Sequence, residues 1–197
     1  LQVQGREWER LAWLKARVVA PAACMDKVPA LRDIVTPFVF RRYLDYNVID
    51  ALRELHRQIR AHALRQSAGR PERADDVKLG RGGIREIEFF IQALQLINAG
   101  KNPHLRERNS LLALKLLCEE GLVTAEEKDS LSAAYRFLRT AEHRIQVVNE
   151  QQTHNLPTRP EELLALARRC GFAHTDAFMA ALQQHRGHVT AIFRDLF

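Results

Sequence analysis

Residues 77–92 read VKLGRGGIREIEFFIQ, a stretch in which a glycine-rich turn runs directly into an amphipathic helix. Gly80, Gly82 and Gly83 allow positive φ and a close approach of the backbone to another group. The apolar residues that follow recur at helical spacing and predict a helix from Gly83 to about Asn98. The stretch therefore predicts both a helix and a tight turn at its entrance.

Charged residues around the turn favour a polar site over a plain connector. Lys78 and Arg81 add positive charge, and the free N–H groups of a helix start attract anions. Three charged residues follow in the first turns of the helix: Arg85, Glu86 and Glu88. An alternative stays open, in which the glycines only turn the chain, the two glutamates complement the helix dipole, and Arg85 pairs with one of them.

The N-terminal part of the chain predicts two helices before the turn. The first is closed by Pro21 and has four apolar residues at helical spacing: Trp8, Leu11, Leu14 and Val18. Thr36 and Pro37 are typical of a helix start and open a long helix. Its expected buried stripe consists of Leu44, Val48, Leu52, Leu55 and Ile59. Residues 67–76 lack periodicity and predict a loop.

Caps and glycines mark further helices in the C-terminal part of the chain. The expected ranges are Asn109 or Ser110 to Gly121, Thr124 to about Asn149, Glu161 to Cys170, and Thr175 to the end. Thr124 and Glu127 form a capping box. The helix that they open has an inner face of Leu131, Tyr135, Leu138, Ile145 and Val148. No strand alternation is present, so we predict an all-α bundle of about seven helices.

Composition limits the class of protein. A chain of 197 residues, 46% of them hydrophobic, is long enough for one domain with a proper core. No apolar run approaches the roughly 18 residues that span a bilayer, and no signal peptide is visible, so we expect a cytoplasmic protein without a membrane partner. Cys24, Cys118 and Cys170 are widely spaced and predict reduced, buried thiols rather than a disulfide framework or a zinc site.

The first helix also carries a basic stripe, formed by Arg6, Arg10, Trp13 and Arg17. Such a stripe could hold a phosphate and stack a base or a protein side chain. A solvated arginine face, with Trp13 packed on a neighbour, is the preferred interpretation from the residues alone.

A second stripe, Arg136, Arg139 and His143, lies near Glu142 and Gln146 on a later helix and could face the glycine turn. Ordinary surface charge explains this stripe nearly as well. The eight histidines have no nearby carboxylates at metal-ligand spacing, so we assign no metal site to this chain.

Residues 77–92 resemble the signature that follows the nucleotidyltransferase core in the glutamine synthetase adenylyltransferase family. Other segments resemble the same family in the same order: QGREWERLAWLKARVV at 4–19, PFVFRRYLDY at 37–46, AYRFLRTAEHRIQ at 134–146 and EQQTHNLP at 150–157. The family has one half that attaches AMP to a tyrosine of glutamine synthetase and one half that removes it. GREWER at 5–10 and the pair Arg85-Glu86 resemble the N-terminal, removing half.

The resemblance implies a chemistry and a place for this chain within it. The removing half would use orthophosphate to release ADP from AMP-tyrosine on the synthetase, while the other half uses ATP. Nucleotidyl transfer needs carboxylates on Mg²⁺, which this superfamily supplies from a Gly-Ser turn and an Asp-x-Asp pair. Neither motif occurs in this sequence, which also begins at Leu1 without a methionine. We therefore expect the metal site upstream, and a fragment that is inactive alone.

Domain organisation follows from the same resemblance. We expect a single all-α domain over 1–197, the helical domain that follows the catalytic core. Within it, 1–20 would be a linking helix, 37–157 the main bundle with the glycine-rich turn at 77–83, and 158–197 the C-terminal helices.

The resemblance also implies roles for the residues around the turn. Lys78, Arg81, Gly82 and Gly83 would contact phosphate, and Arg85 would pair with phosphate or with a catalytic carboxylate. The remaining two, Glu86 and Glu88, would orient these cations. The implied partners are glutamine synthetase, the PII signal protein, ATP or ADP, and phosphate.

Two alternatives stay open at this point. The chain could be the helical domain of the attaching half, or a non-catalytic basic module that docks a protein or a nucleic acid. The net charge of +6 fits a nucleic-acid partner as well as phosphorylated ones. The basic residues are spread over several helices rather than gathered on one, which favours the enzyme, so we expect no nucleic-acid partner.

Overall fold

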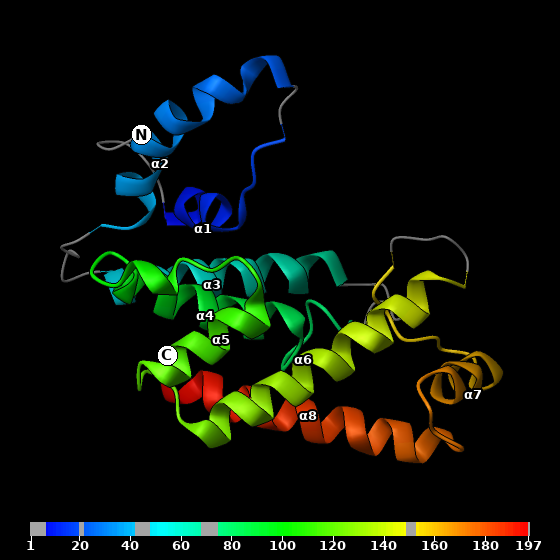
Figure 1. Cartoon of the computed structure of the whole chain (residues 1–197). Helices are drawn as coiled ribbons and strands as arrows, with labels where there is room; N and C mark the ends of the chain where they lie inside the picture. Colours follow the sequence, from blue (N-terminus) through cyan, green and yellow to red (C-terminus); the bar gives the residue numbers. More distant parts are fainter. Residues whose placement is uncertain (1–6, 20–21, 42–47, 68–74, 149–152, 197) are drawn as a thin grey trace. The chain divides into compact units, whose positions relative to one another are not determined.

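The protein, seen here as a computed structural model, is described at residues 7–19, 22–41, 48–67, 75–148 and 153–196 (Figure 1). In chain order its helices are α1 (Glu7–Lys15), the 3₁₀ helix η1 (Ala22–Lys27), α2 (Val28–Val39), α3 (Val48–Ser67), α4 (Ile84–Asn98), the 3₁₀ helix η3 (Pro103–Leu105), α5 (Ser110–Glu119), α6 (Ala125–Gln146), α7 (Pro160–Arg169) and α8 (Thr175–Leu196). Within the described ranges there is no strand, only an isolated bridge between Asp76 and Asn155. The predicted all-α fold is confirmed.

The chain divides into two compact units. Unit 1 comprises residues 1–56 and 91–123, and unit 2 comprises residues 57–90 and 124–197. Helices α3 and α4 each contribute one part to each unit. The single domain expected over 1–197, with its subdivisions, stays a prediction.

In unit 1, one residue of the basic stripe, Arg10, has a different role from either interpretation, whereas Arg17 is exposed and Arg6 lies outside the described residues. Arg10 is completely buried, and its Nε and Nη2 donate to the Val39 carbonyl at 3.3 and 2.9 Å. The positive charge of Arg10 therefore lies at the C-terminus of α2, where the negative end of the helix dipole stabilises it. The expectation of a solvated arginine face is wrong for Arg10, because its spacing of four from the buried Leu14 places it on the inner side of α1.

Helix boundaries in unit 1 differ from the prediction at two places. α1 ends at Lys15, and Trp8 and Val18 are exposed rather than buried. Thr36 and Pro37 lie near the end of α2 and do not open a helix. Pro29, in the first turn of α2, supplies the same start signal eight residues earlier.

The long helix expected after Pro37 is instead α3, which begins at Val48. Residues 42–47, with Leu44 of the expected stripe, lie outside the described residues. Leu52 is fully buried, as the stripe predicts, whereas Leu55 is only partly buried.

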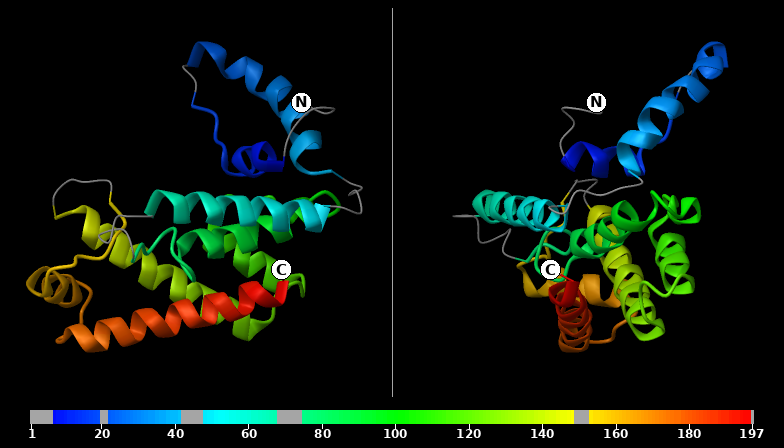
Figure 2. Two further views of the ribbon diagram at one scale, coloured as in Figure 1. Left: turned by 180° about the vertical axis from the view of Figure 1, so that it is seen from behind. Right: turned by 90° about the vertical axis from the view of Figure 1, so that its left-hand side faces the viewer.

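Unit 2 follows the sequence prediction more closely. α4 and α7 occur within one residue of their expected ranges, and the capping box of Thr124 and Glu127 opens α6 as predicted. α6 ends at Gln146 rather than Asn149, so Val148 is 49% exposed instead of facing inward. α6 and α8 lie side by side and form the main helix pair of the unit (Figures 1 and 2).

Two expectations from composition can be compared with the structure. Cys24, Cys118 and Cys170 are free, but each is partly exposed, so the expectation of buried thiols is wrong. Among the described helices, none combines the length and the apolar character needed to cross a membrane.

Aromatic rings fill the contact between α6 and α8, and one histidine lies among them. The rings of Phe137 and His185 are 4.7 Å apart, and Phe137 also packs on Phe178 at 5.8 Å. Within the described part of the chain, the buried Nδ1 of His185 has no hydrogen-bond partner. Burial lowers the pKa of His185 below its usual value, and the charge of His188 lowers the pKa further.

We expect the free energy of unfolding to fall as the pH drops from about 7.5 to about 5, with a contribution from His185. The folded pKa is the lower one, so the unfolded chain binds the proton first as the pH falls through its own value of about 6.5. Denaturant unfolding of wild type and His185→Gln at both pH values measures this contribution. The exposed His104→Gln is the control and should leave the pH dependence unchanged. An identical pH dependence in wild type and His185→Gln would contradict the assignment.

Candidate functional site

The glycine-rich turn is a compact, hydrogen-bonded loop at the start of α4. Gly82 has a φ of +68°, in the left-handed region that glycine adopts at low cost. The Gly80 amide donates to the Asp76 carbonyl, and the Gly83 amide donates to the Gly80 carbonyl, both at 3.0 Å. The sequence correctly predicts both the turn and its need for glycine.

Steric limits explain why side chains are excluded from the turn. A Cβ on Gly82 would lie 2.3 Å from the carbonyl oxygen of Arg186 in α8. A Cβ on Gly80 would lie 2.3 Å from the Asp76 carbonyl oxygen. The turn therefore packs directly on the backbone of α8, with no room for even a methyl group.

The amides at the start of α4 already have acceptors within the chain. Glu86 is buried, and its Oε2 accepts from the Gly82 amide at 2.9 Å. The amides of Ile84 and Arg85 donate to the carbonyls of Val77 and Lys78 at 3.2 and 3.0 Å. An anion would have to displace these acceptors, so the side chains around the turn are better placed to bind it. The predicted contacts of Gly82 and Gly83 with phosphate stay predictions.

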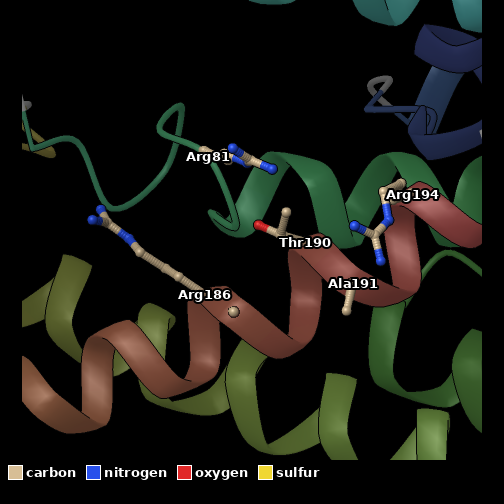
Figure 3. A pocket seen from close by; sticks show the side chains of 6 residues that line it. Arg81, Arg186, Thr190, Ala191 and Arg194 are labelled. Atoms are coloured by element: carbon tan, nitrogen blue, oxygen red, sulfur yellow. The ribbon is translucent and has the colours of Figure 1, made fainter.

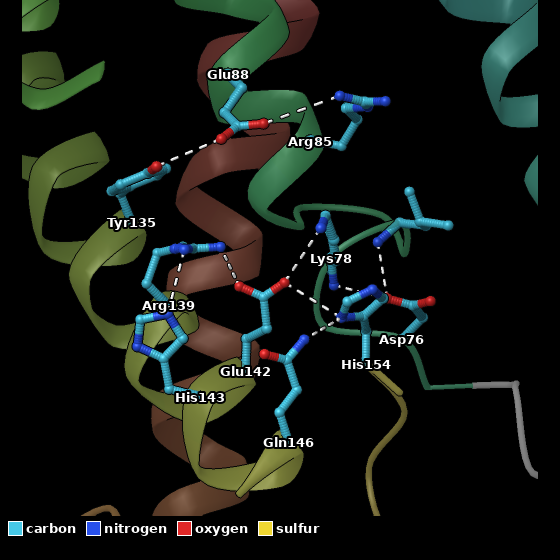
Figure 4. Close-up of polar contacts among 11 residues, drawn as sticks. Asp76, Lys78, Arg85, Glu88, Tyr135, Arg139, Glu142, His143, Gln146 and His154 are labelled. Atoms are coloured by element: carbon cyan, nitrogen blue, oxygen red, sulfur yellow. Dashed lines mark hydrogen bonds and ion pairs between the residues drawn. The ribbon is translucent and has the colours of Figure 1, made fainter. Parts of the chain in front are cut away.

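A buried carboxylate on α6 gathers basic groups on one side of the turn (Figure 4). Glu142 is 1% exposed, and its Oε1 lies 3.3 Å from Lys78 Nζ and 3.2 Å from His154 Nδ1. Arg139 Nη1 bonds to the other oxygen, Oε2. We call these four residues, Glu142, Lys78, Arg139 and His154, the Glu142 cluster. Lys78 and Arg139 carry two fixed positive charges against one carboxylate, so the cluster has a positive surplus.

The Glu142 cluster shows where the stripe of Arg136, Arg139 and His143 on α6 lies relative to the glycine turn. Arg139 shares Glu142 with Lys78, so for this residue the structure favours the position beside the glycine turn over ordinary surface charge. His143 Nε2 lies 3.2 Å from Arg139 Nη2. Arg136 is exposed. The sequence analysis gave Glu142 no role of its own. Its burial could have been predicted, because Glu142 lies four residues after Leu138 and three before Ile145, on the buried face of the helix.

Arg85 and Glu88 form a second polar group on α4 (Figure 4). Glu88 Oε2 lies 4.0 Å from Arg85 Nη1, and Glu88 Oε1 accepts from the Tyr135 hydroxyl at 3.3 Å. The Arg85 side chain is 52% exposed, so this loose pair leaves its guanidinium within reach of a ligand. Whether it binds phosphate stays a prediction.

Residues 75–77, which lead into the turn, are bound by α8 and by the chain around His154. Arg186 on α8 forms an ion pair with Asp75, and its Nη2 donates to the Asp76 carbonyl at 2.8 Å. The Val77 amide donates to the His154 carbonyl at 2.9 Å, and the Leu156 amide donates to the Asp75 carbonyl at 3.0 Å. α6, α8 and the chain around His154 thus fix the turn together. Arg186 has no signal in the sequence, and His154 stands only within the segment 150–157 that resembles the family. The fold alone brings both to the turn.

Both aspartates before the turn have structural partners. Asp75 pairs with Arg186, and Asp76 Oδ1 accepts from the amides of Lys78 and Leu79 at 2.7 and 2.8 Å. Across the described residues, no group of three or more histidines, cysteines or carboxylates could hold a metal ion.

Comparison with known proteins gives a consistent result. A family model described as GlnD PII-uridylyltransferase matches residues 53–197. Proteins named bifunctional glutamine synthetase adenylyltransferase/adenylyl-removing enzyme are 50% identical in Burkholderia mallei and 44% identical in Neisseria meningitidis, over 99% and 100% of this chain. The protein of Xanthomonas axonopodis with the same name is 46% identical over 99% of the chain.

The chain spans about a fifth of the length of these relatives, 21% in Burkholderia mallei. The similarity nevertheless extends over 99% to 100% of this chain. The resemblance to the glutamine synthetase adenylyltransferases is thereby confirmed, and, because the family model matches residues 53–197, the chain belongs to the GlnD PII-uridylyltransferase family.

Proposed function

We propose that the chain is the helical part of the adenylyl-removing half of a bifunctional glutamine synthetase adenylyltransferase/adenylyl-removing enzyme. The observation that carries this proposal is the 50% identity over 99% of the chain with an enzyme of that name. The segment GREWER at 5–10 and the pair Arg85-Glu86, which resemble the removing half, support the choice between the two halves.

The proposed reaction is attack of orthophosphate on the phosphorus of AMP-tyrosine in glutamine synthetase. The new P–O bond gives ADP, the bond to the tyrosine oxygen breaks, and that oxygen takes a proton. The reacting groups are anionic throughout, so cations that are held in place around them lower the barrier.

The cations around the glycine turn are suited to that role. Lys78 is held by Glu142 and Arg85 by Glu88, yet their side chains are 32% and 52% exposed. A carboxylate that holds a cation reduces the loss of side-chain freedom when that cation binds phosphate. Arg81 is exposed at the tip of the turn. In this proposal Lys78, Arg81 and Arg85 contact phosphate, Glu88 orients Arg85, and Glu86 keeps the turn in shape through Gly82.

The metal belongs to another part of the enzyme in this proposal. Since the described residues offer no ligand set, Mg²⁺ would be bound by carboxylates in the larger part of the enzyme that this chain does not span. The PII protein and ATP are further partners proposed for the whole enzyme.

The test is ADP release from adenylylated glutamine synthetase in the presence of phosphate and Mg²⁺. This chain alone should be inactive, and an enzyme that also contains the metal-binding domain should be active. Activity of this chain alone would overturn the division of roles.

Arg85→Ala in the whole enzyme should lower the rate of ADP release by about 10- to 100-fold, the loss expected for one hydrogen bond to a charged group. Adenylylation of the synthetase by the same variant should be unchanged, because that activity would lie in the other half. Arg168→Ala, an exposed arginine on α7, is the matched control for lost charge. Loss of adenylylation with normal ADP release would assign the chain to the attaching half.

A further inference from the structure

A pocket of about 350 Å³ lies between the glycine turn and α8, and none of the four residues of the Glu142 cluster lines it. Its lining residues are Arg81, Arg186, Gly187, Thr190, Ala191 and Arg194 (Figure 3). Three of these residues are arginines, and none of the described residues that line the pocket is acidic. The lining is therefore basic, although the charge of Arg186 is balanced by its ion pair with Asp75.

The register of α8 makes one face of the helix basic and hollow. Arg186, Thr190 and Arg194 follow one another at intervals of four and share this face. Gly187 and Ala191, next to them, are small and leave room in front of the helix. As far as the structure describes its surroundings, a Cβ on Gly187 would meet no atom within 4 Å.

The three arginines do not have equal roles. Arg186 extends away from the other two and is bound to Asp75 and to the Asp76 carbonyl (Figure 3). Arg81 comes from the glycine turn, and Thr190 and Arg194 come from successive turns of α8 (Figure 3). Arg186 thus holds the segment before the turn, while Arg81, Thr190 and Arg194 are the other polar residues of the lining.

We propose that this pocket binds a phosphate group through Arg81, Thr190 and Arg194. Guanidinium groups match the geometry of phosphate oxygens with paired N–H donors, and a threonine hydroxyl adds a further donor. The pocket is larger than a phosphate ion needs, so it also has room for part of a nucleotide. Inorganic phosphate and the terminal phosphate of a nucleotide present the same oxygen acceptors to these donors. This site extends the proposed function to α8, where no role was assigned from the sequence.

Titration of this chain with inorganic phosphate and, separately, with ADP tests the site. Binding is followed by isothermal calorimetry and by NMR shifts of the amides of α8. Arg194→Gln and Thr190→Val should each weaken binding, by about 10- to 100-fold for the arginine and less for the threonine. Arg168→Gln, an exposed arginine on α7, is the control and should bind as wild type does.

The two ligands distinguish the sources of the phosphate group. Phosphate binding that both variants weaken supports a site for the free ion, and ADP binding alone, weakened in the same way, supports a nucleotide phosphate. No binding of either ligand, or binding that is lost in Lys78→Gln but not in Arg194→Gln, overturns the proposal. Because the titration needs no glutamine synthetase, failure of the proposed reaction would not alter its result.

Discussion

Gly82→Ala should destabilise unit 2 by about 2–5 kcal/mol, since it combines a left-handed backbone with an overlap that requires repacking. The Cβ would lie 2.3 Å from the Arg186 carbonyl oxygen and 2.6 Å from the Arg186 Cα. These are backbone atoms of α8, so they cannot move aside as a flexible side chain would. Denaturant unfolding followed by circular dichroism measures the loss.

Gly171→Ala is the matched control in the same unit. Gly171 has a φ of +90°, but among the described atoms nothing lies within 4 Å of the position of its Cβ. Its cost should therefore be the backbone cost alone, about 1–2 kcal/mol. Equal losses in the two variants would show that the turn does not pack on α8 as tightly as the structure indicates.

Glu142→Gln should cost about 1–3 kcal/mol, because it removes the one negative charge that Lys78 and Arg139 share. The Glu142 side chain is 1% exposed, whereas Lys78 and Arg139 are 32% and 35% exposed. The two cations can therefore turn toward water, which keeps the loss below that of a completely buried pair. The glutamine amide would also present donors of its own to basic groups that need an acceptor.

The exposed pair of Arg159 and Glu162 provides the comparison for Glu142. Its side chains are 76% and 55% exposed, so Glu162→Gln should change the free energy of unfolding by less than about 0.5 kcal/mol. In the whole enzyme, Glu142→Gln should also lower ADP release, because Lys78 loses the group that positions it. Unchanged stability and unchanged release together would remove the Glu142 cluster from the site.

Local signals account for the parts of the fold that the sequence predicted correctly. α4, α5, α6 and α7 have a glycine or a cap at their ends, and each of these devices acts within a few residues. The prediction failed around Pro37, because proline marks a helix start only when the residues before it are not already helical. Pro29 carried the same signal, and no local rule decides between the two.

The candidate site could be predicted only in part, for a similar reason. Lys78, Arg85 and Glu88 lie within one stretch of sequence, and Arg85 pairs with Glu88 three residues later. The partner of Lys78, Glu142, lies on α6 far along the chain. Arg186 is 111 residues away from Asp75, and nothing in the sequence selects it over the other arginines of the chain. Glu142 and Arg10 could have been recognised, because each occupies a position where the helical register calls for an apolar residue.

The dependence of the glycine turn on α8 has a consequence for the order in which the protein takes shape as it is made. Residues 75–83 are synthesised early, but the backbone against which Gly82 packs and the guanidinium that holds Asp75 both belong to Arg186. Because translation runs from the N-terminus to the C-terminus, the turn waits for more than a hundred further residues before its support exists. The polar site around the glycine turn is thus completed only after α8 has been made.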